Sequence, residues 1–345
     1  MKKIVSSFSV TIGVLTAIAV LLSFSAGPAV AETYDWKLQS VFRTPATLDG
    51  LKLFAENVKK ESNGKINIKI YGANELVKIR GTLGAVQSGA IQMANSAGPY
   101  NARQIPEGNV EFGLPFSWRN WGEAWEAWTQ YGLGEKISEA YAEKGLHLIT
   151  IQPAAEYCLM STKPVYKVED LKGIKVRAIG LTAKIMKALG ASPTNIPGAE
   201  QYVALQRGTV DATTYPVLVL DAYKLKEVIR YVILPSVISP PTTEIFMNLD
   251  LWKSLPQDMK DAIDRASTGH QAYMDERYLR EGYIAVGGFI MKGIGEVIVL
   301  PESEVKKIRK IAFAEWDKLG QKGPRVKELV DIMKKFMADK GMTAE

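Results

Sequence analysis

The order of strand and helix patterns near the start of the chain restricts it to an α/β architecture. Residues 36–42 have the composition of a strand. Apolar residues then recur at three- and four-residue steps over residues 48–58, which predicts an amphipathic helix. Residues 65–70 alternate lysine or asparagine with isoleucine, the period of a strand with one buried face. Strand, helix and strand in this order predict a parallel βαβ unit.

An internal echo predicts that the chain contains two similar lobes. The segment VQSGAIQ at residues 86–92 matches LQRGTVD at residues 205–211 at a constant offset. Each segment is predicted to end a helix at a glycine, Gly89 or Gly208, and to begin a strand. Glycine suits this position because it adopts the left-handed conformation that closes a helix.

The second half of the chain continues the α/β pattern and then changes character. Residues 256–291 read as one long helical segment, in which Gly287 and Gly288 predict a bend or break. The remaining predicted elements are strands at 174–178 and 297–300, helices at 181–189 and 198–206, and helices after Pro301 and Pro324. No low-complexity linker separates the halves, so we expect several ordered crossings between the lobes rather than one tether.

The N-terminus has the features of a cleavable secretory signal peptide over residues 1–31. Lys2 and Lys3 precede an apolar run, and Ala29-Val30-Ala31 supplies a small-residue cleavage site. The only cysteine of the chain is Cys158, which predicts neither an internal disulfide nor a lipid-anchored N-terminus. We therefore expect a freely diffusing, monomeric periplasmic protein, stabilised by its hydrophobic core.

Composition and motifs argue against an enzyme and against nucleic-acid binding. The formal net charge is +6, but lysine and arginine alternate with acidic residues along predicted helix faces, which is typical of solvated surface. The two histidines, His147 and His270, do not form a metal-ligand motif, and neither a GxSxG elbow nor a phosphate-binding loop occurs. We expect no cofactor and no catalytic site.

Four motifs in the middle of the chain resemble one family. The sequence runs DLKG at residues 170–173, a strand carrying Arg177, GASP at 190–193, and ALQRGTVD at 204–211. In this order and spacing the chain resembles the solute-binding receptors of tripartite ATP-independent periplasmic (TRAP) transporters, and the resemblance covers nearly the whole mature chain.

The resemblance implies a fold and a division into lobes. It implies a two-lobed α/β periplasmic binding protein, class II-like, with the ligand cleft between the lobes and a long late helix spanning both. We expect residues 32–154 with 243–282 to form lobe I, and residues 155–242 with 283–345 to form lobe II. The partners would be a small organic carboxylate and the TRAP membrane permease.

Arg177 is the strongest candidate for the ligand anchor. It follows a strand at the carboxyl end, where open α/β sheets bind ligands. Its guanidinium matches the two oxygens of a carboxylate and stays charged when water is excluded. We expect a monocarboxylate, either a 2-oxo, a 2-hydroxy or an aromatic acid.

Other candidates follow from family position. Glu156 stands where dicarboxylate receptors have an arginine, which argues against a second ligand carboxylate; it could bond a ligand hydroxyl or pair with Arg177. Thr214 and Tyr215 replace the acidic residue and tryptophan of cation-binding members, so we expect no metal. Further expected wall or site residues are Asn195, Phe42, Asn95, Phe112, Phe116, Glu244 and Gln152.

Two alternatives remain open from the sequence. One is an exported enzyme acting on a small acid, with Glu156 and Tyr215 as its only available acid–base pair. The other is a receptor that presents its loaded form to a signalling partner.

Overall fold

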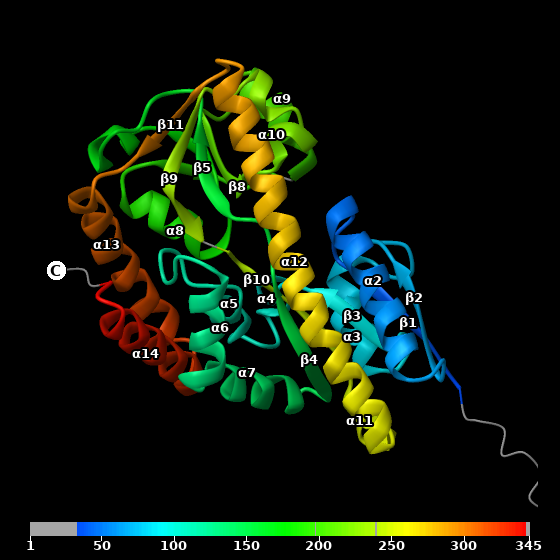
Figure 1. The fold of residues 1–345 in the computed structure, drawn as a ribbon. Helices are drawn as coiled ribbons and strands as arrows, with labels where there is room; N and C mark the ends of the chain where they lie inside the picture. The colour runs from blue at the N-terminus through cyan, green and yellow to red at the C-terminus, as the bar shows by residue number, and fades with distance from the viewer. Residues whose placement is uncertain (1–32, 197, 239, 343–345) are drawn as a thin grey trace, which may run out of the picture.

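The computed structural model describes residues 33–196, 198–238 and 240–342. The predicted signal peptide lies outside the described residues. The chain folds around two mixed sheets, each flanked by helices, which form two lobes stacked end to end (Figure 1). None of the helices among the described residues combines the length and apolarity that a bilayer span requires.

Sheet A forms the first lobe and has the strand order β2-β1-β3-β10-β4. Its strands are β1 (Tyr34–Ser40), β2 (Ile66–Tyr71), β3 (Met93–Ser96), β4 (Leu146–Pro153) and β10 (Thr242–Asn248). Strands β1, β2 and β3 are parallel, which confirms the predicted βαβ unit, and β10 runs antiparallel to both of its neighbours. The helices of this lobe are α2 (Pro45–Glu61), α3 (Thr82–Gln87), α4 (Gly98–Asn101), α5 (Gly108–Glu111), α6 (Trp121–Gln130), α7 (Leu133–Ala142) and α11 (Leu249–Ser254).

Sheet B forms the second lobe and has the strand order β11-β9-β5-β8-β6-β7. Its strands are β5 (Tyr157–Ser161), β6 (Lys175–Arg177), β7 (Ser192–Thr194), β8 (Ala212–Pro216), β9 (Tyr231–Ile238) and β11 (Glu296–Val299). Strands β6, β7 and β8 are parallel, and β5 runs antiparallel to β8 and β9. The helices here are α8 (Gly180–Ala188), α9 (Gln201–Gln206) and α10 (Val219–Ala222), with short 3₁₀ turns at η2 (Val168–Leu171), η3 (Gly198–Glu200) and η4 (Leu225–Glu227); a further turn, η1 (Ile79–Gly81), precedes α3.

The sequence echo corresponds to equivalent turns in the two lobes. Gly89 lies between α3 and β3, and Gly208 lies between α9 and β8. Both glycines have the left-handed backbone conformation, with φ of 74° and 67°. Two matching helix–glycine–strand turns, one in each sheet, confirm the predicted pair of similar lobes.

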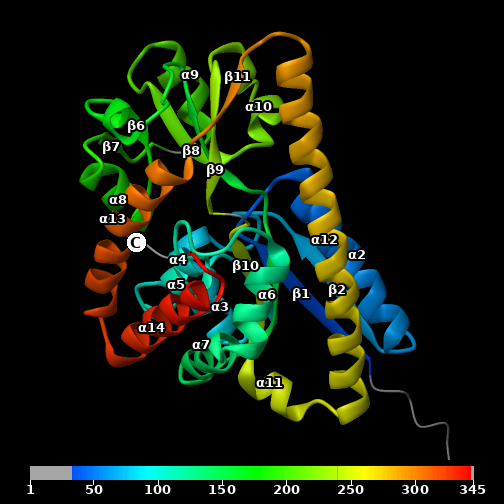
Figure 2. The same cartoon turned by 60° about the vertical axis from the view of Figure 1, so that its left-hand side comes forward.

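Three connections join the two sheets. The chain passes from β4 to β5 through residues 154–156, and it returns from β9 to β10, which Pro240 and Pro241 precede. The third connection is α12 (Gln257–Met291), a helix of 35 residues that packs on α2 and β4 of the first lobe and on α10 and β11 of the second. Figure 2 shows it running along one side of both lobes.

The predicted bend or break at Gly287 and Gly288 is wrong, because α12 continues as one α-helix to Met291. Each glycine costs a helix about 1 kcal/mol relative to alanine. Burial of Ala285 and Phe289 on either side of the pair offsets this cost, since tertiary packing supplies most helix stability.

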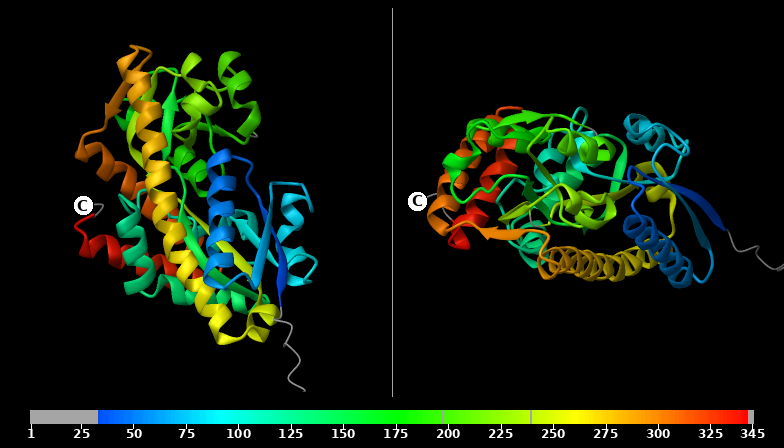
Figure 3. Two further views of the ribbon diagram at one scale, coloured as in Figure 1. Left: turned by 45° about the vertical axis from the view of Figure 1, so that its right-hand side comes forward. Right: turned by 90° about the horizontal axis from the view of Figure 1, so that it is seen from above.

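The C-terminal helices α13 (Glu302–Gly320) and α14 (Pro324–Asp339) form a hairpin that lies across the molecule from α12 in the view of Figure 2, and Figure 3 shows the same helices from two further directions. α13 packs on α8 and η2 of the second lobe, whereas α14 packs on α5 and α7 of the first. The predicted placement of all residues 283–345 with the second lobe therefore does not describe α14. Its amphipathic face, which buries Leu329, Met333 and Phe336, packs against α13 and against α5 and α7 of the first lobe.

Candidate functional site

Arg177 is the last residue of β6 and is almost completely buried, with 5% of its surface exposed. Its Nε donates to the carbonyl of Ile196 (3.0 Å), and one terminal nitrogen donates to the carbonyl of Thr214 (3.3 Å). Among the described residues no carboxylate pairs with it. Burying a cation without an anion is costly, so the remaining donors of this guanidinium are suited to an anionic ligand.

Tyr215 packs against this guanidinium. The Arg177 Cζ lies 4.8 Å from the centroid of the Tyr215 ring, a cation–π distance. Gly198 leaves room for the phenol, because a Cβ there would lie 2.4 Å from the tyrosine oxygen. Burial raises the pKa of Tyr215 to about 12, so the phenol is neutral and can donate a hydrogen bond.

A cavity of about 90 Å³ lies beside Tyr215, between the two lobes. We call it the cleft cavity. Its wall combines aromatic side chains of both lobes with one from α12: Phe42 and Phe112 from the first lobe, Tyr157, Tyr215 and Tyr223 from the second, and Tyr278 from α12. No charged side chain lines it. Arg177 itself lies behind the Tyr215 ring rather than on the wall.

The charge of Arg177 reaches tyrosines on both sides of the cleft. Burial raises the pKa of Tyr100, in α4 of the first lobe, and the nearby Arg177 guanidinium opposes this shift. The same opposing effect acts on Tyr157, whose pKa burial also raises. The cleft therefore presents neutral phenol groups and one cation.

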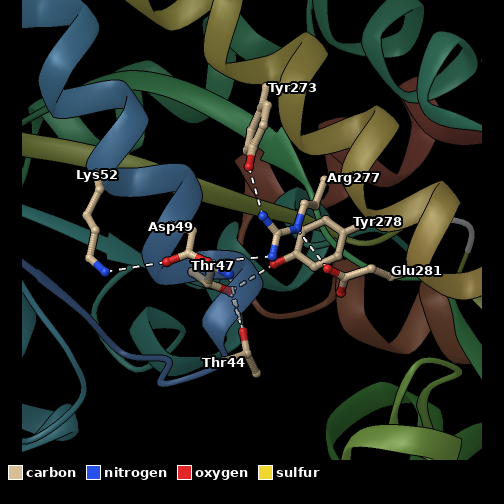
Figure 4. A network of polar contacts seen from close by, with 8 residues as sticks. All are labelled: Thr44, Thr47, Asp49, Lys52, Tyr273, Arg277, Tyr278 and Glu281. Carbon is tan, nitrogen blue, oxygen red and sulfur yellow. Dashed lines mark hydrogen bonds and ion pairs between the residues drawn. The ribbon is translucent and has the colours of Figure 1, made fainter.

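A polar network fixes the first-lobe wall of the cleft to α12 (Figure 4). The Tyr278 and Thr47 hydroxyls are 2.8 Å apart, and Thr44 bonds Thr47 at 2.7 Å. Nearby, Arg277 lies 3.6 Å from Asp49 of α2 and 2.7 Å from Glu281 of its own helix. Because Thr44, Thr47 and Tyr278 all line the cleft cavity, this network sets its shape.

The structure brings only part of the predicted site to the cleft cavity. Phe42, Phe112 and Tyr215 line it, and Thr214 supports Arg177 through its carbonyl. Asn195 is exposed and stands apart from the cavity wall. Phe116 is packed in the core, with a positive φ of 68°.

Three predicted site residues are buried inside the first lobe instead. Asn95 bonds Ser40 and the carbonyl of Glu244, and Gln152 bonds His270. Glu244 is fully buried and accepts a hydrogen bond from Asn101 (2.8 Å). None of the three lines the cleft cavity.

Glu244 belongs to a buried carboxyl pair with Glu111. Burial raises the pKa of Glu111 to about 8 and that of Glu244 well above its ordinary value. The charge of Glu111 raises the pKa of Glu244 further, whereas the hydrogen bond between the two carboxyl groups partly opposes the shift of Glu111. Tyr141 donates to Glu111 at 2.9 Å. No group of three or more His, Cys, Asp or Glu side chains in the described part of the chain is arranged to hold a metal ion.

Glu156 and Tyr157 are neighbours on one extended segment, so their side chains point to opposite sides. Tyr157 lines the cleft cavity, whereas Glu156 lines a different cavity and accepts a hydrogen bond from Ser236 (2.9 Å). Glu156 and Tyr215 therefore do not form the acid–base pair that the enzyme alternative requires. Sequence reasoning missed Tyr157, which the alternation of strand side chains next to Glu156 could have indicated.

Comparison with known proteins places the chain in a family. A family model described as "Bacterial extracellular solute-binding protein, family 7" matches residues 43–322. A monocarboxylate 2-oxoacid-binding periplasmic protein of Nostoc is 25% identical over 87% of this chain and 83% of its own. A C4-dicarboxylate-binding periplasmic protein of Rhodobacter capsulatus is 28% identical over 73% of this chain and 75% of its own.

A solved structure has the same architecture. A TRAP periplasmic solute-binding protein of Rhodobacter sphaeroides, in an apo open state, superimposes with a TM-score of 0.80 at 26% identity, over 90% of this chain and 100% of that one. These relatives are binding proteins rather than enzymes. The chain belongs to the family 7 extracellular solute-binding proteins, the periplasmic receptors of TRAP transporters.

Proposed function

We propose that this receptor captures a small monocarboxylate between its lobes and delivers it to a TRAP membrane permease. The observation that carries the proposal is the buried Arg177 guanidinium, which has no carboxylate partner among the described residues and stacks on a tyrosine of the cleft. A carboxylate would satisfy both its charge and its free donors.

The surroundings of Arg177 favour one ligand carboxylate rather than two. Among the described residues no charged side chain lines the cleft cavity, so the nearby Arg177 is the one cation available to a ligand there. A dicarboxylate would therefore bury one charge without a partner, which is unfavourable. Of the two named relatives, the 2-oxoacid-binding protein fits this arrangement better than the dicarboxylate-binding one.

The size and chemistry of the cleft cavity favour a short solute. Its volume of about 90 Å³ is well below the several hundred Å³ that larger ligands occupy. The aromatic wall covers a carbon skeleton, and neutral phenols such as Tyr215 can donate to an oxo or hydroxyl oxygen. Ligand contacts with both lobes would shift the population toward a closed form for the permease.

Calorimetry with the mature protein tests this function. We expect pyruvate to bind, succinate to bind much more weakly, and pyruvate affinity to fall by about two to four decades in Arg177→Ala, from roughly 3–5 kcal/mol of lost interaction. A matched exposed variant, Arg207→Ala, controls for loss of one positive charge. Equal affinities of Arg177→Ala and the parent would refute the anchor, and preference for succinate would refute the monocarboxylate class.

We infer that residues 1–31 direct export and are then removed, and that the mature receptor is a monomer. Mass spectrometry of the protein from a periplasmic extract should give an N-terminus near Glu32. Light scattering should give the mass of one chain.

A further inference from the structure

A second, larger cavity lies behind the cleft, where the connections between the lobes meet. Its volume is about 380 Å³, and we call it the hinge cavity. Ala154 and Tyr278 line both cavities and separate them. Glu156, whose neighbour Tyr157 faces the cleft, points into the hinge cavity.

All three connections between the two sheets contribute to this wall. The first supplies Glu156, the second supplies Pro240, and α12 supplies Asp275, Tyr278 and Gly282. The volume is within the range of sites for drug-sized molecules, whereas the cleft cavity suits only a shorter solute. A molecule in the hinge cavity would therefore contact every segment that connects the two sheets.

The charges in the hinge cavity are of one sign. Among the described residues, Glu156 and Asp275 are the charged side chains of its wall, and most of the remaining wall is apolar or aromatic. The carboxylate of Glu156 is held in place by Ser236, at 2.9 Å. Aromatic rings of Trp121 and Tyr283 complete the outer wall and can contact a cation through their faces.

The hinge cavity adjoins a surface groove between α6 and α12. The groove has a volume of about 750 Å³ and shares Trp121, Asp275, Leu279 and Tyr283 with the cavity. Tyr283 at this border is 74% exposed. A solute can thus enter from this side without passing through the cleft.

We propose that the hinge cavity is a second small-molecule site, which binds a compact amine with an apolar body. The ammonium group lies near Asp275 and Glu156, and the body fills the apolar space against α12. The charges are opposite to those proposed for the cleft, where the Arg177 guanidinium binds the carboxylate of the ligand.

Titration calorimetry of the mature protein with benzylamine tests the proposal, with benzyl alcohol as the uncharged probe of the same shape. We expect benzylamine to bind at least about tenfold more tightly, because only the amine interacts with the carboxylates. We also expect Asp275→Asn to reduce this preference, and Arg177→Ala to leave benzylamine binding unchanged. If the proposal of a monocarboxylate in the cleft failed, benzylamine binding in the hinge cavity could therefore still be observed.

Two glycines of α12 provide a matched pair of variants. Gly282 lines the hinge cavity, and a Cβ there meets only Val217, at an ordinary 3.5 Å, so Gly282→Leu should fold and fill the space. Gly287 is in the same helix, outside the cavity wall, with nothing within 4 Å of an added Cβ. We expect Gly282→Leu to abolish benzylamine binding and Gly287→Leu to preserve it.

Three results would overturn the proposal. They are absence of benzylamine binding at millimolar concentrations, equal binding of benzylamine and benzyl alcohol, and undiminished benzylamine binding by Gly282→Leu. Thermal unfolding of both leucine variants verifies that each is folded.

Discussion

The two lobes share a framework but use the same position for different purposes. Gln39 in β1 and Arg177 in β6 occupy equivalent places, because β1 and β6 lie beside the equivalent strands β3 and β8 in matching register. Gln39 donates to the carbonyl of Val77 (2.9 Å), and Arg177 donates to the carbonyl of Ile196 (3.0 Å). The two acceptors, Val77 and Ile196, are separated in the sequence by the same number of residues as the two matching segments at 86–92 and 205–211.

Gln39 and Arg177 differ in the hydrogen-bonding groups and charge that remain available after these bonds are made. Gln39 also accepts from the backbone N–H groups of Leu76 (2.8 Å) and Val77 (2.9 Å) and donates to Thr82 (3.3 Å), so its amide is used to hold the segment between β2 and α3. Arg177 retains donors and a charge. The first lobe thus uses the neutral amide of Gln39 for structure, whereas the second lobe has the proposed ligand anchor, Arg177, at the equivalent position.

Replacing Arg177 by glutamine copies the first-lobe residue into the second lobe and should have the largest effect. The amide can keep the bond to Ile196 but carries no charge, so we expect carboxylate affinity to fall by at least about a hundredfold, or roughly 3 kcal/mol. Calorimetry measures the loss, and circular dichroism should show an unchanged fold. If Arg177→Gln kept the carboxylate affinity of the parent, the charge of Arg177 would not be what distinguishes its position from that of Gln39.

Raising the pH should destabilise the first lobe selectively. Burial raises the pKa of Glu111 to about 8, above the ordinary value of 4.5, so between these values the folded state binds more protons than the unfolded state. The free energy of unfolding should therefore fall as pH rises through this window, by up to about 1.4 kcal/mol per pH unit for one group, and level off above it.

Urea unfolding from pH 5 to 8 measures this slope. Glu111→Gln should reduce it, and the double variant with Glu244→Gln should nearly remove it. Glu123→Gln is the control, because Arg119 bonds Glu123 and the pKa of that carboxyl is lowered. A slope that survives in the double variant would assign the pH dependence to other groups.

Gln39→Ala should affect stability and leave binding nearly intact. It removes acceptors from two backbone N–H groups, and we expect a loss of about 2 kcal/mol. Chemical denaturation measures it, and calorimetry should show ligand affinity within about twofold of the parent. A large loss of affinity would show that the amide also contributes to binding.

The smallest effects should come from the paired turns. Gly89→Ala and Gly208→Ala each place a side chain at positive φ, at a cost of roughly 1–2 kcal/mol. No atom lies within 4 Å of either added Cβ, so backbone strain is the only difference from the parent. Equal losses in thermal unfolding would support equivalence of the turns, and clearly unequal losses would contradict it.

Local patterns were sufficient to predict most of the fold. Three patterns depend only on neighbours in the sequence: the helical period of residues 48–58, the alternation at 65–70 and the two glycine turns. They correspond to α2, to β2 and to the turns that precede β3 and β8. The break at Gly287 and Gly288 was predicted wrongly because helix propensity ignores the packing of α12 on both lobes.

The site was less predictable because its walls come from distant segments. Arg177 could be identified from its place at the end of a strand within a family motif. Tyr157, Tyr223 and Tyr278 meet only through tertiary packing of two lobes and a helix, and no local pattern joins them. Glu156 was assigned to the cleft, but the pleat of the chain turns it into the hinge cavity.

The C-terminal hairpin limits how the receptor can move. α13 is fixed to the second lobe, where Glu304 accepts from the Val168 N–H (2.8 Å). α14 is fixed to the first, where Lys340 pairs with Glu126 (2.6 Å). With α12 attached to both lobes on the other flank, any rotation of one lobe against the other must be absorbed by the turn at residues 321–323 or by sliding of α14. The last two helices therefore limit how far the two lobes can move apart when the receptor opens.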